Sequence, residues 1–109
     1  MHRLPIKALS VNKAYRGRRF ASTELKDYKM TLEYLLPKIS SPEGKQRAIY
    51  TFGVSSKGGD LDNLVKCFQD CLSECYGFND NLIYEINSRK IDVKKGEEFI
   101  EFDLIPIAD

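Results

Sequence analysis

The chain has 109 residues, of which 42% are hydrophobic and 30% charged. This balance predicts one soluble globular domain over residues 1–109 and excludes a disordered chain. No run of about 18 apolar residues occurs, and the N-terminus does not resemble a signal peptide, so we expect a cytoplasmic protein. The only histidine is His2, at a terminus that we expect to be frayed. Hydrolases that pair a nucleophile with a histidine base are therefore excluded, and catalysis must use carboxylates, lysines or metal-bound water.

Charge divides the chain into two unlike halves. Residues 1–45 hold ten Lys and Arg and four Asp and Glu, whereas residues 46–109 hold seven and twelve. A basic half suits a polyanion and an acidic half suits a cation. The alternative is that these charges only solvate the surface.

The first half of the chain predicts a strand, a basic loop and a helix. Alternation favours a strand over residues 4–11, followed by the loop of residues 12–20, in which basic and aromatic residues are interleaved. Ser22 or Thr23 can cap a helix that ends before Pro37. Its apolar positions repeat at helical spacing and are Leu25, Tyr28, Leu32 and Leu35.

The second half predicts three strands and another helix. The strands cover residues 48–54, 82–93 and 99–105. The helix follows Asp62 and ends near Gly77, and Lys94-Lys95-Gly96 is expected to be a hairpin turn between the last two strands. The order β-α-β-α-β-β predicts an α+β fold, with a mixed sheet of about four strands and two helices.

Three cysteines lie on one face of the second predicted helix. Cys67, Cys71 and Cys75 are odd in number and four residues apart, which does not fit a secreted disulfide framework. A tetrahedral metal site would need a fourth ligand. We expect these cysteines to be small buried hydrophobic residues.

The most informative stretch lies between residues 58 and 80. If residues 60–62 are extended, Asp60 and Asp62 project to the same side, and Asp80 joins them if the chain returns after the helix. Crowded carboxylates repel unless a cation neutralises them, and oxygen ligands favour Mg²⁺ or Mn²⁺. Lys66, one turn beyond Asp62, can neutralise a phosphate. The alternative is a helix N-cap with an ordinary ion pair to Lys66.

The pattern Asp60-x-Asp62-Asn63-x-x-Lys66, with Asp80 after the helix, resembles the RusA family of Holliday junction resolvases. The Lys-Lys-Gly segment between the last two strands fits the same family, as does Ser10-Val11-Asn12 before the basic loop. The resemblance extends from about residue 9 to about residue 105, in family order and spacing. The chain departs from the family pattern at Asn79, where a second Asp is common, and at Gly58-Gly59, where basic residues are common.

This resemblance implies a Mg²⁺-dependent homodimeric endodeoxyribonuclease of DNA recombination and repair, in which Mn²⁺ can substitute. The family's catalytic and metal-binding aspartates fall on Asp60, Asp62 and Asp80, and its catalytic lysine falls on Lys66. Carboxylate-bound metal offsets the charge that develops on a phosphoryl group and acidifies a bound water. The metal thus replaces the missing histidine base.

The basic loop is expected to bind the branched DNA. Phosphate contacts position a nucleic acid without reading its sequence, and Tyr15 or Phe20 can stack on an unpaired base. The alternative is a solvated loop in which Phe20 belongs to the core. The expected DNA-binding residues are Asn12, Lys13, Tyr15, Arg16, Arg18 and Arg19, although Asn12 can instead order the loop through backbone hydrogen bonds.

Two other functions are compatible with the residues. One is a non-catalytic protein of the same fold that binds branched or single-stranded DNA, and the other is a metal-binding scaffold. For the nuclease, two opposed cuts require two acidic clusters, which an isologous dimer supplies. Apolar residues that one sheet cannot cover are expected at its seam, with Tyr50, Phe52, Phe99 and Phe102 as candidates.

Overall fold

The structure is a computed structural model that describes residues 1–10, 15–16, 20–56 and 59–108. The expected α+β fold, with two helices and a four-stranded mixed sheet, is confirmed. The elements follow the chain in the order β1 (His2–Leu4), β2 (Tyr15–Arg16), β3 (Phe20–Ala21), α2 (Thr23–Leu35), β4 (Gln46–Val54), α3 (Leu61–Tyr76), the 3₁₀ helix η1 (Asp80–Leu82), β5 (Ile83–Asp92) and β6 (Phe99–Pro106).

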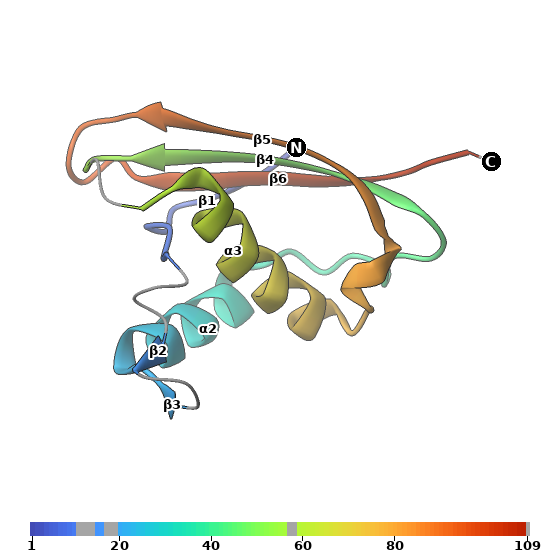
Figure 1. Ribbon diagram of the computed structural model, residues 1–109, viewed down its shortest axis with the longest axis horizontal. Helices are drawn as coiled ribbons and strands as arrows, with labels where there is room; N and C mark the ends of the chain where they lie inside the picture. The colour runs from blue at the N-terminus through green and yellow to red at the C-terminus, as the bar shows by residue number, and fades with distance from the viewer. Residues whose placement is uncertain (11–14, 17–19, 57–58, 109) are drawn as a thin grey trace.

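The main sheet has the strand order β1-β6-β4-β5, and β2 and β3 form a separate short hairpin. β4 pairs antiparallel with β6 and parallel with β5. A parallel pair needs a crossover connection, and α3 provides it between β4 and β5. Figure 1 shows both helices on the same side of the sheet. The described residues therefore form two layers, and none of their helices lies on the other face of the sheet.

The expected hairpin at Lys94-Lys95-Gly96 is wrong, because β4 lies between β5 and β6. The connection instead passes the end of β4, where the Val93 N–H donates to the Val54 carbonyl over 2.8 Å. Five residues of β4 have buried side chains, including Tyr50 and Phe52. A strand with this many buried side chains is stabilised in the centre of a sheet rather than at its edge.

The first strand is also shorter than expected, since β1 ends at Leu4. Pro5 follows, and the Ile6 N–H bonds back to the Leu4 carbonyl over 2.8 Å. Residues 5–10 then leave the sheet. His2 is not frayed, because it lies in β1 and its ring packs against Phe102 with 5.1 Å between centroids.

The core lies between the sheet and the two helices, around a cluster of aromatic rings. Phe68 of α3 meets Tyr50 and Phe102 of the sheet edge to face, with centroids 5.4 and 5.8 Å apart. Such contacts add to the hydrophobic burial of each ring. Cys67 and Cys71 are buried and Cys75 is half-buried, all as free thiols, so the prediction for the cysteines is confirmed for the first two.

The four aromatic residues expected at a dimer seam belong to this chain's own interior. Tyr50, Phe52 and Phe102 have no exposed surface, and Phe99 is 5% exposed. Phe99 lies over Gly53, on which a Cβ would come within 2.4 Å of the ring, and the Arg3 guanidinium covers it 3.8 Å from the ring centroid. The seam prediction is therefore wrong, because the helices and Arg3 already cover these rings.

Three of the four expected helix ends are confirmed, whereas the start of α3, expected after Asp62, lies at Leu61. Ser22 caps α2 and accepts a hydrogen bond from the Leu25 N–H over 3.1 Å. The helix ends one residue before Leu36, which precedes Pro37. Gly77 ends α3 in the left-handed conformation, with φ of 69°, which costs glycine little.

Candidate nuclease site at the start of helix α3

Asp60 and Asp62 lie at the N-terminal end of α3. Asp60 is the N-cap residue, but its side chain makes no capping hydrogen bond, although Asp is among the residues that usually make one. Asp62 lies in the first turn, where it accepts a hydrogen bond from the adjacent Asn63 N–H over 3.0 Å. Both residues are exposed. Their carboxylates therefore do little for the fold and face solvent.

The expectation that residues 60–62 are extended is wrong. The helix begins at Leu61, so Asp62 is a helical residue and only Asp60 keeps the extended conformation, with φ of −72° and ψ of 149°. The two aspartates still lie two positions apart at one helix terminus. The positive end of the helix dipole favours negative charge there.

Asp80 lies beyond the opposite end of α3. The helix has 16 residues, which span about 24 Å, and Asp80 begins η1 three residues after Gly77. Within the described ranges, no three His, Cys, Asp or Glu side chains are grouped to hold a metal ion. The predicted meeting of Asp60, Asp62 and Asp80 within one chain is therefore wrong, because Asp80 lies before β5, the strand that brings the chain back toward Asp60.

Lys66 lies one turn beyond Asp62, as expected, but its ion pair is a different one. Its Nζ donates to Asp70 Oδ1 over 3.0 Å, and both side chains are exposed. An exposed pair of this kind contributes about 0.3–0.5 kcal/mol. Lys66 is thus held at the helix surface by a weak interaction that a phosphate can replace.

Two residues that the sequence did not point to hold the segment leading to Asp60. Lys90 of β5 donates from Nζ to the Gly59 carbonyl over 3.1 Å. Glu98 accepts hydrogen bonds from the Ser55 hydroxyl over 2.5 Å and from the Gly96 N–H over 2.8 Å. The bond from Ser55 lowers the pKa of Glu98. The contacts of Lys90 with Gly59 and of Ser55 with Glu98 join positions 31 and 43 residues apart, so no local pattern could indicate them.

The expected DNA-binding residues divide into two groups. Asn12, Lys13, Arg18 and Arg19 lie outside the described residues. Tyr15 and Arg16 form β2, whose backbone pairs with β3 in the register Tyr15 to Ala21 and Arg16 to Phe20. The basic loop expected over residues 12–20, called the basic segment below, therefore includes strands of a short hairpin directly before α2.

Comparison with protein families identifies the family of this chain. The family model described as endodeoxyribonuclease RusA matches residues 6–101, which covers most of the chain. The chain belongs to the RusA endodeoxyribonuclease family. The matched range includes both ends of α3 and the whole basic segment.

RusA proteins are nucleases that act on Holliday junction DNA in recombination. None of the curated proteins compared with this chain matches it. Across the described ranges, no helix has the length and apolar character needed to cross a bilayer.

Proposed function

We propose that this RusA-family chain is a Mg²⁺-dependent endodeoxyribonuclease that resolves Holliday junctions as a homodimer, by paired symmetric nicks. The observation that carries the proposal is the exposed pair Asp60 and Asp62, whose carboxylates make almost no contacts that support the fold. A chain that needed them only for helix capping would use the Asp60 side chain as a cap.

The donor set at this end of α3 fits magnesium. Mg²⁺ prefers oxygen ligands and is commonly bound by one or two carboxylates together with waters and substrate phosphates. Asp60 and Asp62 would hold it, and Mn²⁺ accepts the same ligands. When bound, the cation supplies positive charge that offsets the charge developing on the phosphoryl oxygens.

A two-fold dimer offers a way to bring Asp80 to the same site. β5 begins beside Asp80 and ends near Asp60, where Lys90 contacts Gly59. If β5 pairs antiparallel with its copy, the start of one strand lies opposite the end of the other. Asp80 of the partner subunit would then approach Asp60 and Asp62 of this chain.

The edge of β5 suits such a pairing. In the described part of the chain, β5 has a neighbouring strand on one side only, and an exposed edge strand is a template for pairing with another chain. Tyr84 and Ile86 are 62% and 47% exposed on this strand. These two residues replace the buried aromatic residues of the core as candidates for the dimer seam.

Lys66 and the basic segment would act on the substrate. Lys66 can exchange Asp70 for a phosphate near the cut and stabilise charge there. Asn12, Lys13, Arg16, Arg18 and Arg19 would contact DNA phosphates, and Tyr15 would stack on an unpaired base. Since phosphate contacts do not read sequence, this segment would recognise the branch rather than a base pair.

A non-catalytic DNA-binding protein of the same fold is the second candidate. It is favoured by the separation of Asp80 from Asp60 along the full length of α3, since a chain without a dimer would lack a complete acidic site. It predicts junction binding without cleavage at any magnesium concentration.

A nicking assay distinguishes the two candidates. A synthetic four-way junction and a linear duplex of the same sequence are incubated with the protein, with Mg²⁺ or with EDTA. The nuclease proposal expects two symmetric cuts in the junction only, and only with Mg²⁺. Junction binding with no cleavage in Mg²⁺ or Mn²⁺ would favour the second candidate.

A further inference from the structure

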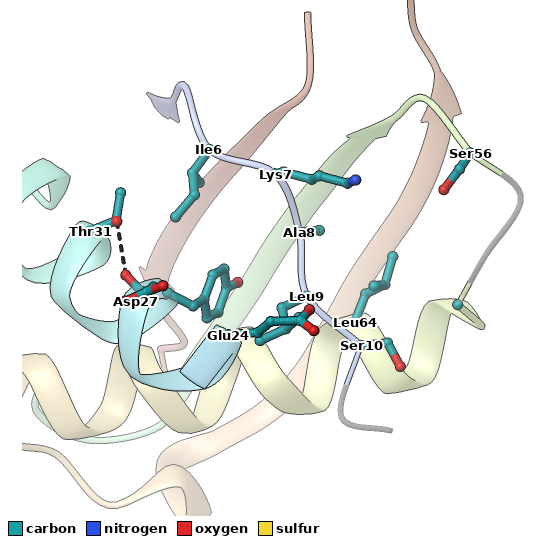
Figure 2. Close-up of a pocket in the computed structure, with 12 residues that line it drawn as sticks. Ile6, Lys7, Ala8, Leu9, Ser10, Glu24, Asp27, Thr31, Ser56 and Leu64 are labelled. Atoms are coloured by element: carbon teal, nitrogen blue, oxygen red, sulfur yellow. Dashed lines mark hydrogen bonds between the residues drawn. The ribbon is translucent and has the colours of Figure 1, made fainter. Parts of the chain in front are cut away.

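The conformation of Gly59 sets the direction in which the chain enters α3. Gly59 has φ of 90°, a backbone conformation that glycine adopts at little cost. A Cβ at this position would lie 3.4 Å from Leu64 and 3.5 Å from Ser10, two residues that Figure 2 shows close together at the start of α3. These are ordinary van der Waals distances, so the backbone conformation and not the available space favours glycine. Because glycine is also the most flexible residue, such a turn is held in one arrangement by contacts from other elements.

Lys90 provides such a contact from the sheet. It lies near the end of β5, beside Phe52 of β4 in the parallel register, so its side chain points to the same face of the sheet as Phe52. The ring of Phe52 packs against Phe68 of α3, so this is the face that α3 covers. The Lys90 Nζ donates to the Gly59 carbonyl over 3.1 Å. The lysine thus joins the sheet to the segment before α3, and its charge makes the bond stronger than one between neutral groups.

The carbonyl that Lys90 holds belongs to the peptide group that leads into Asp60. A peptide group is planar, so a contact that fixes its oxygen also fixes the direction of the Asp60 N–H. The Asp60 carbonyl in turn accepts hydrogen bonds from the N–H groups of Asn63 and Leu64 over 3.1 and 3.2 Å. Asp62 lies within this first turn of the helix. One lysine contact therefore restrains both aspartates of the proposed metal site.

We propose that Lys90 is a positioning residue, whose hydrogen bond to the Gly59 carbonyl holds Asp60 and Asp62 in the arrangement that binds Mg²⁺. The inference rests on the proposed function, which assigns the cation to these two aspartates. The bond engages a backbone oxygen, so the lysine takes no carboxylate oxygen from the cation. Groups that orient metal ligands in this way raise metal affinity, and their loss typically lowers it by about 10- to 100-fold. Lys90 therefore differs from Lys66, which is proposed to meet the substrate.

A positioning role and a purely electrostatic role predict opposite changes in metal affinity. An ammonium group near a metal site repels the cation, so removal of a lysine that acted through charge alone would tighten metal binding. Removal of a lysine that holds the ligands in place weakens it. Lys90→Met removes the donor and the charge and keeps a long unbranched side chain, whereas Lys90→Arg keeps a charged N–H donor.

Metal affinity is measured without DNA, by titrating the whole protein with Mn²⁺ and following free Mn²⁺ by electron paramagnetic resonance. We expect Lys90→Met to bind Mn²⁺ about 10-fold more weakly than the wild type, the lower part of the range for loss of an orienting contact. Lys90→Arg should restore most of the affinity, because arginine also donates N–H groups. Lys95→Met is the matched control, since Lys95 is an exposed lysine in the connection after β5.

Amide hydrogen exchange distinguishes a local effect from a loss of stability. In Lys90→Met, the N–H groups of Asn63 and Leu64 should exchange about 10-fold faster, because the first turn that they close is less restrained. The Phe78 N–H, which bonds to the Ser73 carbonyl at the opposite end of α3, should exchange at an unchanged rate. A lysine that only stabilised the fold would accelerate exchange at both ends.

Unchanged or tighter Mn²⁺ binding by Lys90→Met would overturn the proposal, as would a wild type that binds no Mn²⁺. Unchanged exchange at Asn63 and Leu64, or faster exchange at both helix ends, would overturn it too. The failure of the proposed function looks different. A wild type that binds Mn²⁺ in a Lys90-dependent way but never nicks a junction would remove the nuclease and keep the role of Lys90. Magnesium-dependent nicking, with equal Mn²⁺ affinity in the wild type and Lys90→Met, would remove that role and keep the nuclease.

Discussion

Polar groups at the C-terminal end of α3 bond to the fold itself, whereas those at the N-terminal end face solvent. After Tyr76, the N–H groups of Gly77 and Phe78 both bond to the Ser73 carbonyl. The Tyr76 hydroxyl donates to the Pro37 carbonyl over 2.7 Å, and the Ser41 hydroxyl donates to the Tyr76 carbonyl over 3.0 Å. At the other end, Asp60 leaves its side chain out of the cap.

This difference separates groups that stabilise the protein from groups that are available for chemistry. Proteins normally provide hydrogen-bond partners for the polar groups at helix ends. Exposed acids at a helix N-terminus otherwise add only a modest stabilisation, through the helix dipole. We therefore expect substitutions at the N-terminal end of α3 to change activity without changing stability. Substitutions at the C-terminal end should change stability without changing activity. Asp80 is the exception, because it is a proposed site residue.

The largest effect is expected at the two N-terminal aspartates. Asp60→Asn or Asp62→Asn should slow nicking at least about 1,000-fold, or about 4 kcal/mol. Junction binding should persist or tighten, because a negative charge is removed near phosphates. Stability should change by less than about 0.5 kcal/mol, since both residues are exposed. Gel assays of nicking and binding measure this, with Glu74→Gln as an acid-to-amide control near the other end of the helix.

Lys66→Ala tests whether a residue of the N-terminal half of α3 other than the two aspartates contributes to cleavage. A positive charge used in the transition state predicts a loss of about 2–4 kcal/mol in the cleavage barrier. A purely structural pair with Asp70 predicts a stability change below about 1 kcal/mol and unchanged turnover. Asp70→Asn removes the same pair and keeps the lysine, so it should retain cleavage. Loss of cleavage in both variants would assign Lys66 to structure alone.

Gly77→Ala tests the C-terminal end. Gly77 has φ of 69°, and a Cβ there meets nothing within 4 Å. The cost is therefore that of a left-handed backbone for alanine, about 1 kcal/mol of unfolding free energy. Urea denaturation measures it. Nicking well below the melting temperature should be unchanged, and a loss of nicking at unchanged stability would erase the distinction between the two ends.

The smallest effect concerns Glu98, which holds Ser55 in the segment that leads to the N-terminal end. Its pKa lies below the ordinary value of 4.5, chiefly because of the Ser55 hydrogen bond. A lowered pKa stabilises the folded protein above the unfolded value and ceases to do so as pH falls through the folded value. The melting temperature of the wild type should exceed that of Glu98→Gln at pH 7, and the difference should vanish in acid. A difference that grows on acidification would contradict the assignment.

Local signals in the sequence predicted the two helices and three of their four ends. Ser22, Pro37 and Gly77 act through their own backbone or side chain, so the sequence alone indicates them. The position of β4 between β5 and β6 depends on contacts between distant segments. The alternation in β5 and β6 is the same whether they pair with each other or with β4, which is why the hairpin at Gly96 was expected.

The site was predictable in part for the same reason. The spacing of Asp60, Asp62 and Lys66 lies within one helical segment, and family resemblance identified it. The helical pattern up to Gly77 already implies a long helix between Asp62 and Asp80, so their separation follows from the rise per residue. The contacts of Lys90 and Glu98 depend on the register of strands that no local pattern fixes.

The central claim is that one nuclease site combines the N-terminal end of α3 with Asp80 of the partner subunit. Asp60→Asn and Asp80→Asn are prepared separately, unfolded, mixed and refolded, and assayed on a junction. In mixed dimers, one site carries both substitutions and the other carries none. The account predicts that each variant alone is inactive and that the mixture regains nicking of one strand. A mixture as inactive as either variant would contradict it, because each site would then draw all its aspartates from a single chain.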